Sequence, residues 1–262
     1  MIKHSFAVMA YKDSAYLADC IRSLQNQTVK SNIYVTTSTP SNYIDDISKE
    51  FGIEVFKTKS GLGIGHDWNF SVSHAKTKYV TLAHQDDVYD PAYTENCLRT
   101  CEKFKDTLIC FTSYDEILVN ELREKNLTII IKEVLLRILM PFKDNLKGKF
   151  AKKLSLAFGN SISCPGVMYN RELLGDFKFS DQYAINLDWD AWLRMSAMNG
   201  RFVYIPKQLF KHRIHAASAT TEGLKANVRQ HEDFDIFCRI WPKFIAKLLS
   251  KFYAGSYKSN EV

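Results

Sequence analysis

The sequence has no long uncharged apolar run, no paired-cysteine motif and no internal repeat. Its most apolar stretch, residues 127–142, carries Lys132, Glu133 and Arg137, whereas a membrane span needs about 18 or more apolar residues. The six cysteines form no CxxC pair, so their spacing gives no zinc site, and we expect reduced, mostly buried thiols. Residues 1–14 lack the apolar core of a signal peptide. Together these absences predict a cytoplasmic protein.

The composition is that of a folded protein. The 262 residues suffice for one large α/β domain, and 46% hydrophobic with 24% charged residues is ordinary for such a domain. The net charge of +6 is compatible with an anionic substrate, an anionic membrane or nucleic acid, and equally with simple solubility. No nucleic-acid module surrounds the basic residues, so we expect no nucleic-acid partner.

The first hundred residues alternate short apolar runs with amphipathic segments. This alternation predicts a Rossmann-like, mostly parallel sheet flanked by helices. The strands expected here are 5–10, 32–37, 53–57 and 79–83, and the helices are 15–26, 67–75 and one opened by Pro91.

The second half is less regular. We expect a strand at 107–113, a helical region at 127–156, an extended segment at 161–170, a helix at 187–199 ended by Gly200, and strands at 201–205 and 208–212. The chain after residue 222 is helical and basic in pattern, which predicts a C-terminal helical extension.

Ligands of such sheets bind beyond the carboxyl ends of the strands. The strand at 79–83 is followed by His84, Gln85, Asp86 and Asp87. Two adjacent carboxylates repel each other unless a cation or a donor is present, and oxygen ligands suit Mg²⁺ or Mn²⁺. The alternative is that Asp86 and Asp87 only cap the helix near Pro91.

Two further clusters follow predicted elements. Asp188 and Asp190 begin the helix at 187–199, where acids also suit the helix dipole without any catalytic role. In Lys211–His215, two histidines flank Arg213 after a strand, a pattern that favours a phosphate or metal site.

Four segments, in order, resemble family 2 glycosyltransferases with the GT-A fold: residues 5–28, 60–91, 187–200 and 210–220. The second contains the match to the family's DxD motif, and the third the match to its acidic motif with the catalytic base. The resemblance covers roughly residues 3–221. It implies a GT-A domain at 1–221, with a nucleotide-sugar-binding half at 1–112 and an acceptor-binding half at 113–221, followed by a basic helical extension at 222–262.

The resemblance also implies site residues and ligands. Asp188 matches the catalytic base, and Asp86 and His215 match positions that hold Mn²⁺ or Mg²⁺. The expected donor-binding residues are Ala10, Tyr11, Asp13, Thr37, Asp67, Asn69, His84, Gln85, Asp87 and Arg213. The implied reaction is inverting hexosyl transfer from a nucleoside-diphosphate sugar, with UDP favoured, to a glycan or lipid-linked acceptor. The pathway implied is polysaccharide or lipopolysaccharide synthesis.

The chain departs from the family pattern at three positions. His84 replaces the first acid of DxD, residues 35–38 lack the usual carboxylate, and Leu187 precedes the base in place of an acid. These departures favour, as one alternative, a catalytically altered nucleotide- or glycan-binding protein of the same fold. A nucleotidyltransferase is another, although the turn at 10–13 lacks the glycine-rich loop of that class.

Basic residues gather in the second half among apolar ones. They are Lys132, Arg137, Lys143, Lys147, Lys149, Lys152 and Lys153, and the segment 239–251 has a similar character. This pattern indicates peripheral contact with an anionic membrane, or alternatively an ordinary solvated helix face packed on the core.

Overall fold

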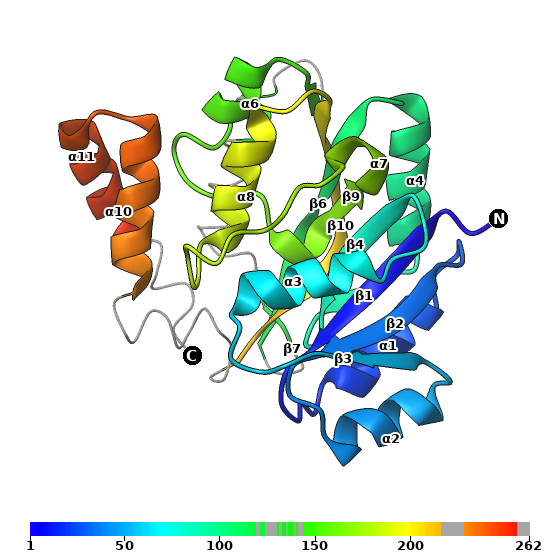
Figure 1. Cartoon of the computed structure of the whole chain (residues 1–262). Coiled ribbons are helices and arrows are strands. Elements are labelled where there is room, and N and C mark those ends of the chain that lie inside the picture. The colour runs from blue at the N-terminus through cyan, green and yellow to red at the C-terminus, as the bar shows by residue number, and fades with distance from the viewer. Residues whose placement is uncertain are drawn as a thin grey trace.

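The computed structural model describes residues 1–118, 121–123, 130, 133–134, 136–138, 140, 144–215 and 228–255 (Figure 1). Ten strands among these residues form one sheet in the order β3-β2-β1-β4-β9-β6-β10-β5, with β7 paired to β6 and β8 to β10. The strands are β1 (His4–Ala10), β2 (Asn32–Thr37), β3 (Glu54–Lys57), β4 (Tyr79–His84), β5 (Val88–Tyr89), β6 (Thr107–Leu118), β7 (Glu121–Leu122), β8 (Asn145–Leu146), β9 (Val167–Asn170) and β10 (Arg201–Ile214).

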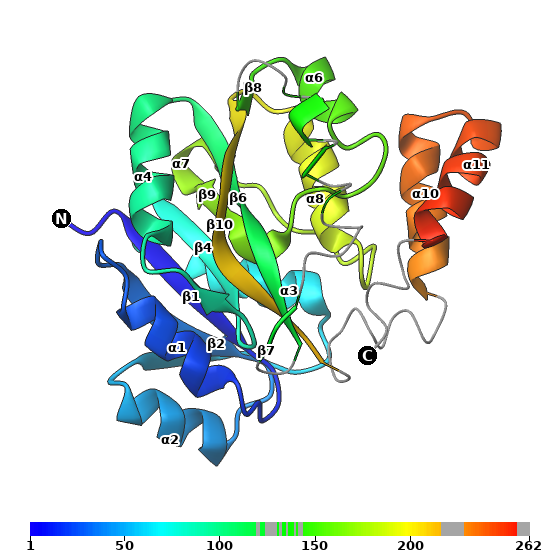
Figure 2. The ribbon, with the colours of Figure 1, turned by 180° about the vertical axis from the view of Figure 1, so that it is seen from behind.

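The first four of these strands along the sheet, β3-β2-β1-β4, are parallel. Because helices cover both faces, the run from Phe6 to Ala10 in β1 is apolar: Phe6 and Val8 enter one core cluster and Ala7 enters the other. Helices α1 (Leu17–Gln25), α2 (Asn42–Glu50) and α4 (Tyr93–Lys103) cover one face (Figure 2). Helices α3 (Ile64–Ser73) and α8 (Leu187–Ser196) cover the other (Figure 1).

The predicted α/β class with a mostly parallel sheet is confirmed, and several element boundaries need correction. β10 is one long strand with register shifts after Ile205, where we expected two strands. Helix α2, which we did not predict, is capped by Ser41, whose hydroxyl accepts from the Ile44 amide. Helix α4 begins at Tyr93, so Pro91 precedes the helix and is not its first residue. The boundary expected between residues 112 and 113 falls inside β6.

The Lys-rich region is not one continuous helix. It contains β8 and the short helix α6 (Lys149–Leu154), while Lys132 and Lys143 lie outside the described residues. Lys152 is fully buried, and its ammonium donates to the carbonyls of Met198 and Gly200 at 2.7 and 2.9 Å. Lys152 therefore holds the segment that follows α8, and its side chain does not face a membrane.

The predicted C-terminal helices are confirmed as a hairpin of α10 (Val228–Ile240) and α11 (Lys243–Ala254). The hairpin lies on the side of α8 (Figure 1). The ring centroids of Phe237 and Tyr253 lie 5.0 and 5.6 Å from that of Trp189 in α8. Among the described residues, we find no helix with the length and apolar character needed to cross a bilayer.

A buried histidine in β1 makes the stability of this sheet depend on pH. His4 is fully buried between the hydroxyls of Ser31 and Thr81, and burial lowers the pKa of His4 to about 3. The unfolded chain, with a histidine pKa of about 6.5, binds the proton more readily, so stability present above pH 6.5 is lost as the pH falls.

We expect the His4 contribution to fall by about 2 kcal/mol between pH 6.5 and pH 5, at about 1.4 kcal/mol per pH unit. Urea unfolding at pH 7 and pH 5 would measure it, with His4→Gln as the variant that cannot titrate. Equal pH dependence in both proteins, or an NMR titration of His4 near pH 6, would contradict this expectation.

Candidate active site

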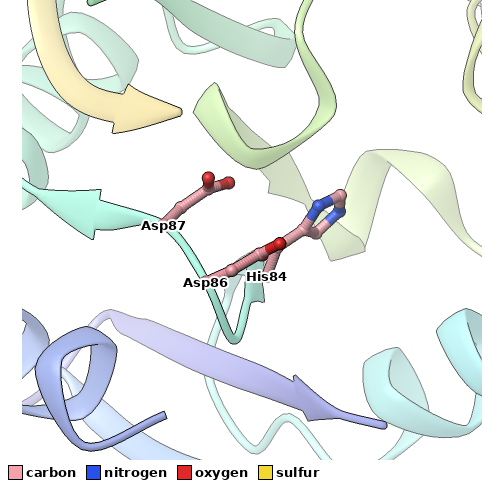
Figure 3. A group of neighbouring side chains, drawn as sticks. All are labelled: His84, Asp86 and Asp87. Carbon is pink, nitrogen blue, oxygen red and sulfur yellow. The ribbon is translucent and has the colours of Figure 1, made fainter. Parts of the chain in front are cut away.

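The turn after β4 gathers the three groups that the sequence placed at this strand end. His84, Asp86 and Asp87 each direct a potential ligand atom into one cluster, and these atoms lie within 4.8 Å of one another (Figure 3). The buried run of β4 forces this turn to the carboxyl edge of the sheet, where Asp87 remains fully buried. The alternative that Asp86 and Asp87 cap the next helix is wrong, because the N-cap of α4 is Ala92 and no side chain makes a capping bond there.

The end of β10 lies against this turn. The His215 imidazole Nε2 lies 2.8 Å from the Asp86 carboxylate, and His212 Nδ1 lies 3.0 Å from Asp87 Oδ1. The Arg213 amide also donates to Asp87 Oδ1, at 3.0 Å, and its guanidinium donates to the Asp86 carbonyl at 2.9 Å. Two segments about 125 residues apart in sequence therefore form one polar centre.

The centre is electrostatically coupled. Burial would raise the pKa of the Asp86 carboxyl, but the hydrogen bond from His215 and the surrounding imidazoles lower it overall. Burial would lower the pKa of His212, but the Asp87 carboxylate raises it to about 9. His212 is therefore a cation at neutral pH and forms an ion pair with Asp87.

Two buried atoms of the cluster lack hydrogen-bond partners among the described residues: His84 Nε2 and Asp87 Oδ2. Buried polar atoms are normally paired, and an imidazole nitrogen beside carboxylate oxygens is a donor set that suits a divalent cation. The residues present therefore fit a metal ion.

The loops after β1 and β2 are tied to the same edge. The Gln85 side chain makes two hydrogen bonds with the Tyr11 backbone, at 3.1 and 2.8 Å, beside Ala10 at the end of β1. Asp13 accepts from the Ser41 hydroxyl at 2.6 Å, and the buried Thr37 hydroxyl accepts from the Thr39 amide at 3.0 Å. Each of these candidates thus holds a loop at the carboxyl edge.

Helix α3 supplies the carboxylate that the segment after β2 lacks in sequence. Asp67 accepts a 2.7 Å hydrogen bond from Ser38, the residue that follows β2. Burial raises the pKa of Asp67, while this hydrogen bond opposes the shift. Two residues further along α3, Asn69 pairs by its side chain with the backbone of Phe179, which fixes α3 against the second half of the chain.

Asp188 stands in the first turn of α8. One carboxylate oxygen accepts from the Asn160 amide side chain at 2.7 Å, and the other from the Trp189 backbone at 2.7 Å. Burial raises the pKa of the Cys164 thiol, and the carboxylates of Asp188 and Asp87 raise it further. Both carboxylates therefore act electrostatically on the same buried thiol.

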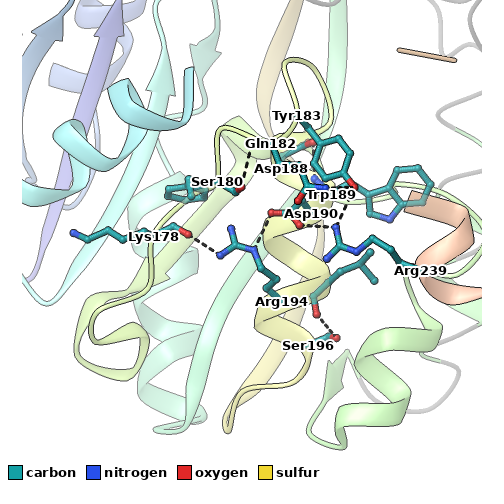
Figure 4. A network of polar contacts seen from close by, with 12 residues as sticks. Lys178, Ser180, Gln182, Tyr183, Asp188, Trp189, Asp190, Arg194, Ser196 and Arg239 are labelled. Carbon is teal, nitrogen blue, oxygen red and sulfur yellow. Dashed lines mark hydrogen bonds and ion pairs between the residues drawn. The ribbon is translucent and has the colours of Figure 1, made fainter. Parts of the chain in front are cut away.

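The second acid of this helix has a different environment. Asp190 is buried and forms ion pairs with Arg194 at 2.8 Å and Arg239 at 2.6 Å (Figure 4). The two aspartates of the motif thus have different partners. Neutral amide groups hold Asp188, whereas two guanidinium groups hold Asp190.

We assigned no individual role to three residues near these groups, although one of them, His212, belongs to the Lys211–His215 pattern that favoured a phosphate or metal site. His212 pairs with Asp87, Asn160 holds Asp188, and the Tyr16 ring lies 4.2 Å from the Arg213 guanidinium carbon. His212 was visible in the Lys211–His215 pattern. Asn160 and Tyr16 carry no sequence signal, because only the fold brings them to the site.

Comparison with known proteins agrees with this architecture. Residues 5–176 match the family model described as Glycosyl transferase family 2. The chain is 27% identical over 207 residues to an uncharacterized glycosyltransferase of Methanocaldococcus jannaschii, covering 76% of this chain and 66% of that protein. It is 28% identical over 111 residues to the putative glycosyltransferase EpsH of Bacillus subtilis, covering 40% and 32%. The chain thus spans about two thirds and one third of these relatives.

Solved structures give the fold. TarS 1–349 of S. aureus in complex with UDP-GlcNAc has a TM-score of 0.67 at 14% identity, covering 98% of this chain and 73% of that one. The mannosyltransferase PcManGT from Pyrobaculum calidifontis, in complex with GDP-Man and Mn²⁺, has a TM-score of 0.63 at 11% identity, covering 99% and 76%. With the GT-A fold, and with a family match that includes the β4 turn, the chain belongs to glycosyl transferase family 2.

Proposed function

We propose that this protein is a metal-dependent, inverting glycosyltransferase that moves a hexosyl group from a nucleoside-diphosphate sugar to an acceptor hydroxyl. We favour a UDP-sugar donor, and a glycan or lipid-linked acceptor in cell-surface glycan synthesis. The observation that carries the proposal is the His84, Asp86 and Asp87 cluster at the carboxyl edge of the sheet, with two buried ligand atoms unpaired among the described residues.

Mn²⁺ or Mg²⁺ would be held by the carboxylates of Asp86 and Asp87, with His84 and His215 beside them. When bound, such a cation stabilises the charge that develops on the leaving diphosphate. Arg213 adds a second positive charge, and the Asp86 carbonyl and the Tyr16 ring hold its guanidinium in place before the donor arrives.

Asp188 is the proposed general base. Its carboxylate accepts the acceptor's proton as the hydroxyl attacks the anomeric carbon, and Asn160 fixes the orientation of that carboxylate. A single displacement from the face opposite the leaving group inverts the anomeric carbon. Asp67, held by Ser38, supplies the proposed polar contact to the nucleoside in place of the missing acid after β2.

A thermal-shift screen of UDP, GDP, dTDP and CMP, with and without Mn²⁺, tests the donor site. We expect one nucleoside diphosphate to raise the melting temperature only with Mn²⁺, because a ligand that binds the folded state stabilises it by mass action. No shift with any nucleotide would contradict the donor site. A shift without sugar transfer or donor hydrolysis would favour the catalytically altered binding protein.

We also propose that α11 is the surface that contacts an anionic membrane. Phe244, Leu248 and Phe252 recur every four residues on this helix, with exposed fractions of 75%, 56% and 75%. The exposed Lys243, Lys247 and Lys251 each precede one of them, so an apolar stripe runs beside a cationic one. This pairing matches the acyl boundary and the negative headgroups of a bilayer.

Vesicle flotation tests this surface directly. The unaltered chain is expected to float with phosphatidylglycerol-containing vesicles and not with neutral phosphatidylcholine vesicles. Replacing Lys243, Lys247 and Lys251 by Gln should remove most of this binding, since each basic residue near the surface contributes about 1 kcal/mol. The matched control replaces the exposed Lys49, Lys76 and Lys103 by Gln, so that the two triple variants have the same net charge. Equal loss in both triple variants, or no flotation of the unaltered chain, would contradict the assignment.

A further inference from the structure

The geometry points to a positioning role for the C-terminal hairpin: we propose that Glu232 of α10 and Tyr253 of α11 hold the two segments that orient the Asp188 carboxylate. This inference rests on the proposed role of Asp188 as the base. The hairpin lies beyond residues 5–176, where the family match is found.

The first contact is made by Glu232 at the entry to α8. Its Oε1 accepts from the Ala184 amide at 2.7 Å, and its Oε2 accepts from the amides of Ile185 and Asn186 at 3.0 and 2.9 Å. One carboxylate thus fixes three consecutive peptide groups immediately before the helix. Charge-assisted hydrogen bonds of this kind are stronger and shorter than neutral ones.

Helix α10 also binds the side chain at the N-cap position of α8. Asn186 occupies the N-cap position, yet its side chain makes no capping bond. Its amide instead donates to the buried Asp233 at 2.6 Å, so α10 anchors the residue two positions before Asp188. Arg239 adds the ion pair to Asp190, two positions after Asp188 (Figure 4). The backbone is therefore held by α10 on both sides of the base.

The second segment is the loop that carries Asn160, the partner of Asp188. The backbone amide of Asn160 donates to the Tyr253 hydroxyl at 3.3 Å. The preceding Gly159 has a φ of +140°, and a Cβ there would come within 2.5 Å of the Tyr253 ring. Glycine is therefore required for this approach, and α11 sets the position of the amide that orients Asp188.

Together these contacts locate Asp188 between two segments that the hairpin holds. A shift of about 1 Å in a reacting group can reduce turnover about 100-fold without affecting substrate binding elsewhere. The hydrogen bonds of Glu232 in the described part of the chain go to the amides of residues 184–186 and not to the cation and nucleotide candidates, so donor affinity provides an internal reference.

The test compares Glu232→Ala with Glu232→Gln, which keeps one carbonyl oxygen as an acceptor. We expect Glu232→Ala to reduce kcat by about 10- to 100-fold, with an unchanged donor KM and an unchanged number of nucleotide sites per chain. Glu232→Gln should recover part of kcat. Glu50→Ala, an exposed glutamate at the end of α2, is the matched control and should keep full activity.

Amide hydrogen exchange provides a readout that does not depend on activity. In Glu232→Ala, exchange should become faster at residues 184–186 and remain unchanged in the strands of the sheet. Faster exchange with an unaltered kcat would overturn the positioning role, and so would a parallel loss of kcat and nucleotide sites. If the unaltered chain transfers no sugar, the proposed function fails instead, while unchanged exchange at 184–186 would refute the Glu232 contact itself.

Discussion

Asp188→Asn is expected to reduce sugar transfer by about 100- to 10,000-fold, the usual contribution of a general base. The amide is nearly the same shape, and its single carbonyl oxygen can still accept from one of the two present donors, the Asn160 side chain or the Trp189 backbone. Nucleotide binding should persist, because the proposed cation site lies on the turn after β4. Initial rates with saturating donor, together with nucleotide affinity, give the measurement.

The control for this variant is Asp176→Asn, an exposed aspartate in the same half of the chain, which should transfer sugar at the normal rate. Asp190→Asn is a poor control, since it would disrupt a buried carboxylate held by two arginines. Retained turnover in Asp188→Asn would remove this residue from the role of base. Loss of nucleotide affinity together with turnover would indicate damage to the fold.

Asp86→Ala is expected to abolish the Mn²⁺-dependent stabilisation by the nucleoside diphosphate. A ligand at 100 times its dissociation constant stabilises the folded state by about 2.7 kcal/mol. For a chain of this size that corresponds to a rise of roughly 5–10 °C in melting temperature, all of which should disappear. The variant also leaves His215 without the carboxylate that lies 2.8 Å from its Nε2.

The exposed Asp19 on α1 gives the comparison for Asp86, since Asp19→Ala removes the same charge from a surface pair with Arg22. It should retain the full Mn²⁺-dependent shift. An Asp86→Ala protein that still shows this shift would exclude Asp86 as a metal ligand. If Asp86→Ala lowers the melting temperature strongly even without a ligand, Asp86→Asn is tested in its place, because it preserves the size of the side chain.

Much of the donor half could be predicted because its signals are local. Strands buried on both faces appear as short, mostly apolar runs, as in β1 and β4, and parallel strands place their carboxyl ends at one edge. That rule alone brought Tyr11, Thr37 and Asp86 to the same side of the sheet. The second half was less predictable, because β9 pairs antiparallel between β4 and β6, and nothing local encodes that insertion.

The sequence by itself determined the α/β class, the four parallel strands of the first half and the acidic turn after β4, since these depend on periodicity and on short motifs. Only the tertiary structure decided what the motif residues contact. It paired His212 with Asp87, brought Asp67 to Ser38, and assigned Asp190 to two arginines but Asp188 to Asn160. The physical reason is that hydrogen bonds and ion pairs depend on distances of about 3 Å, and those distances are fixed by packing between segments far apart in the chain.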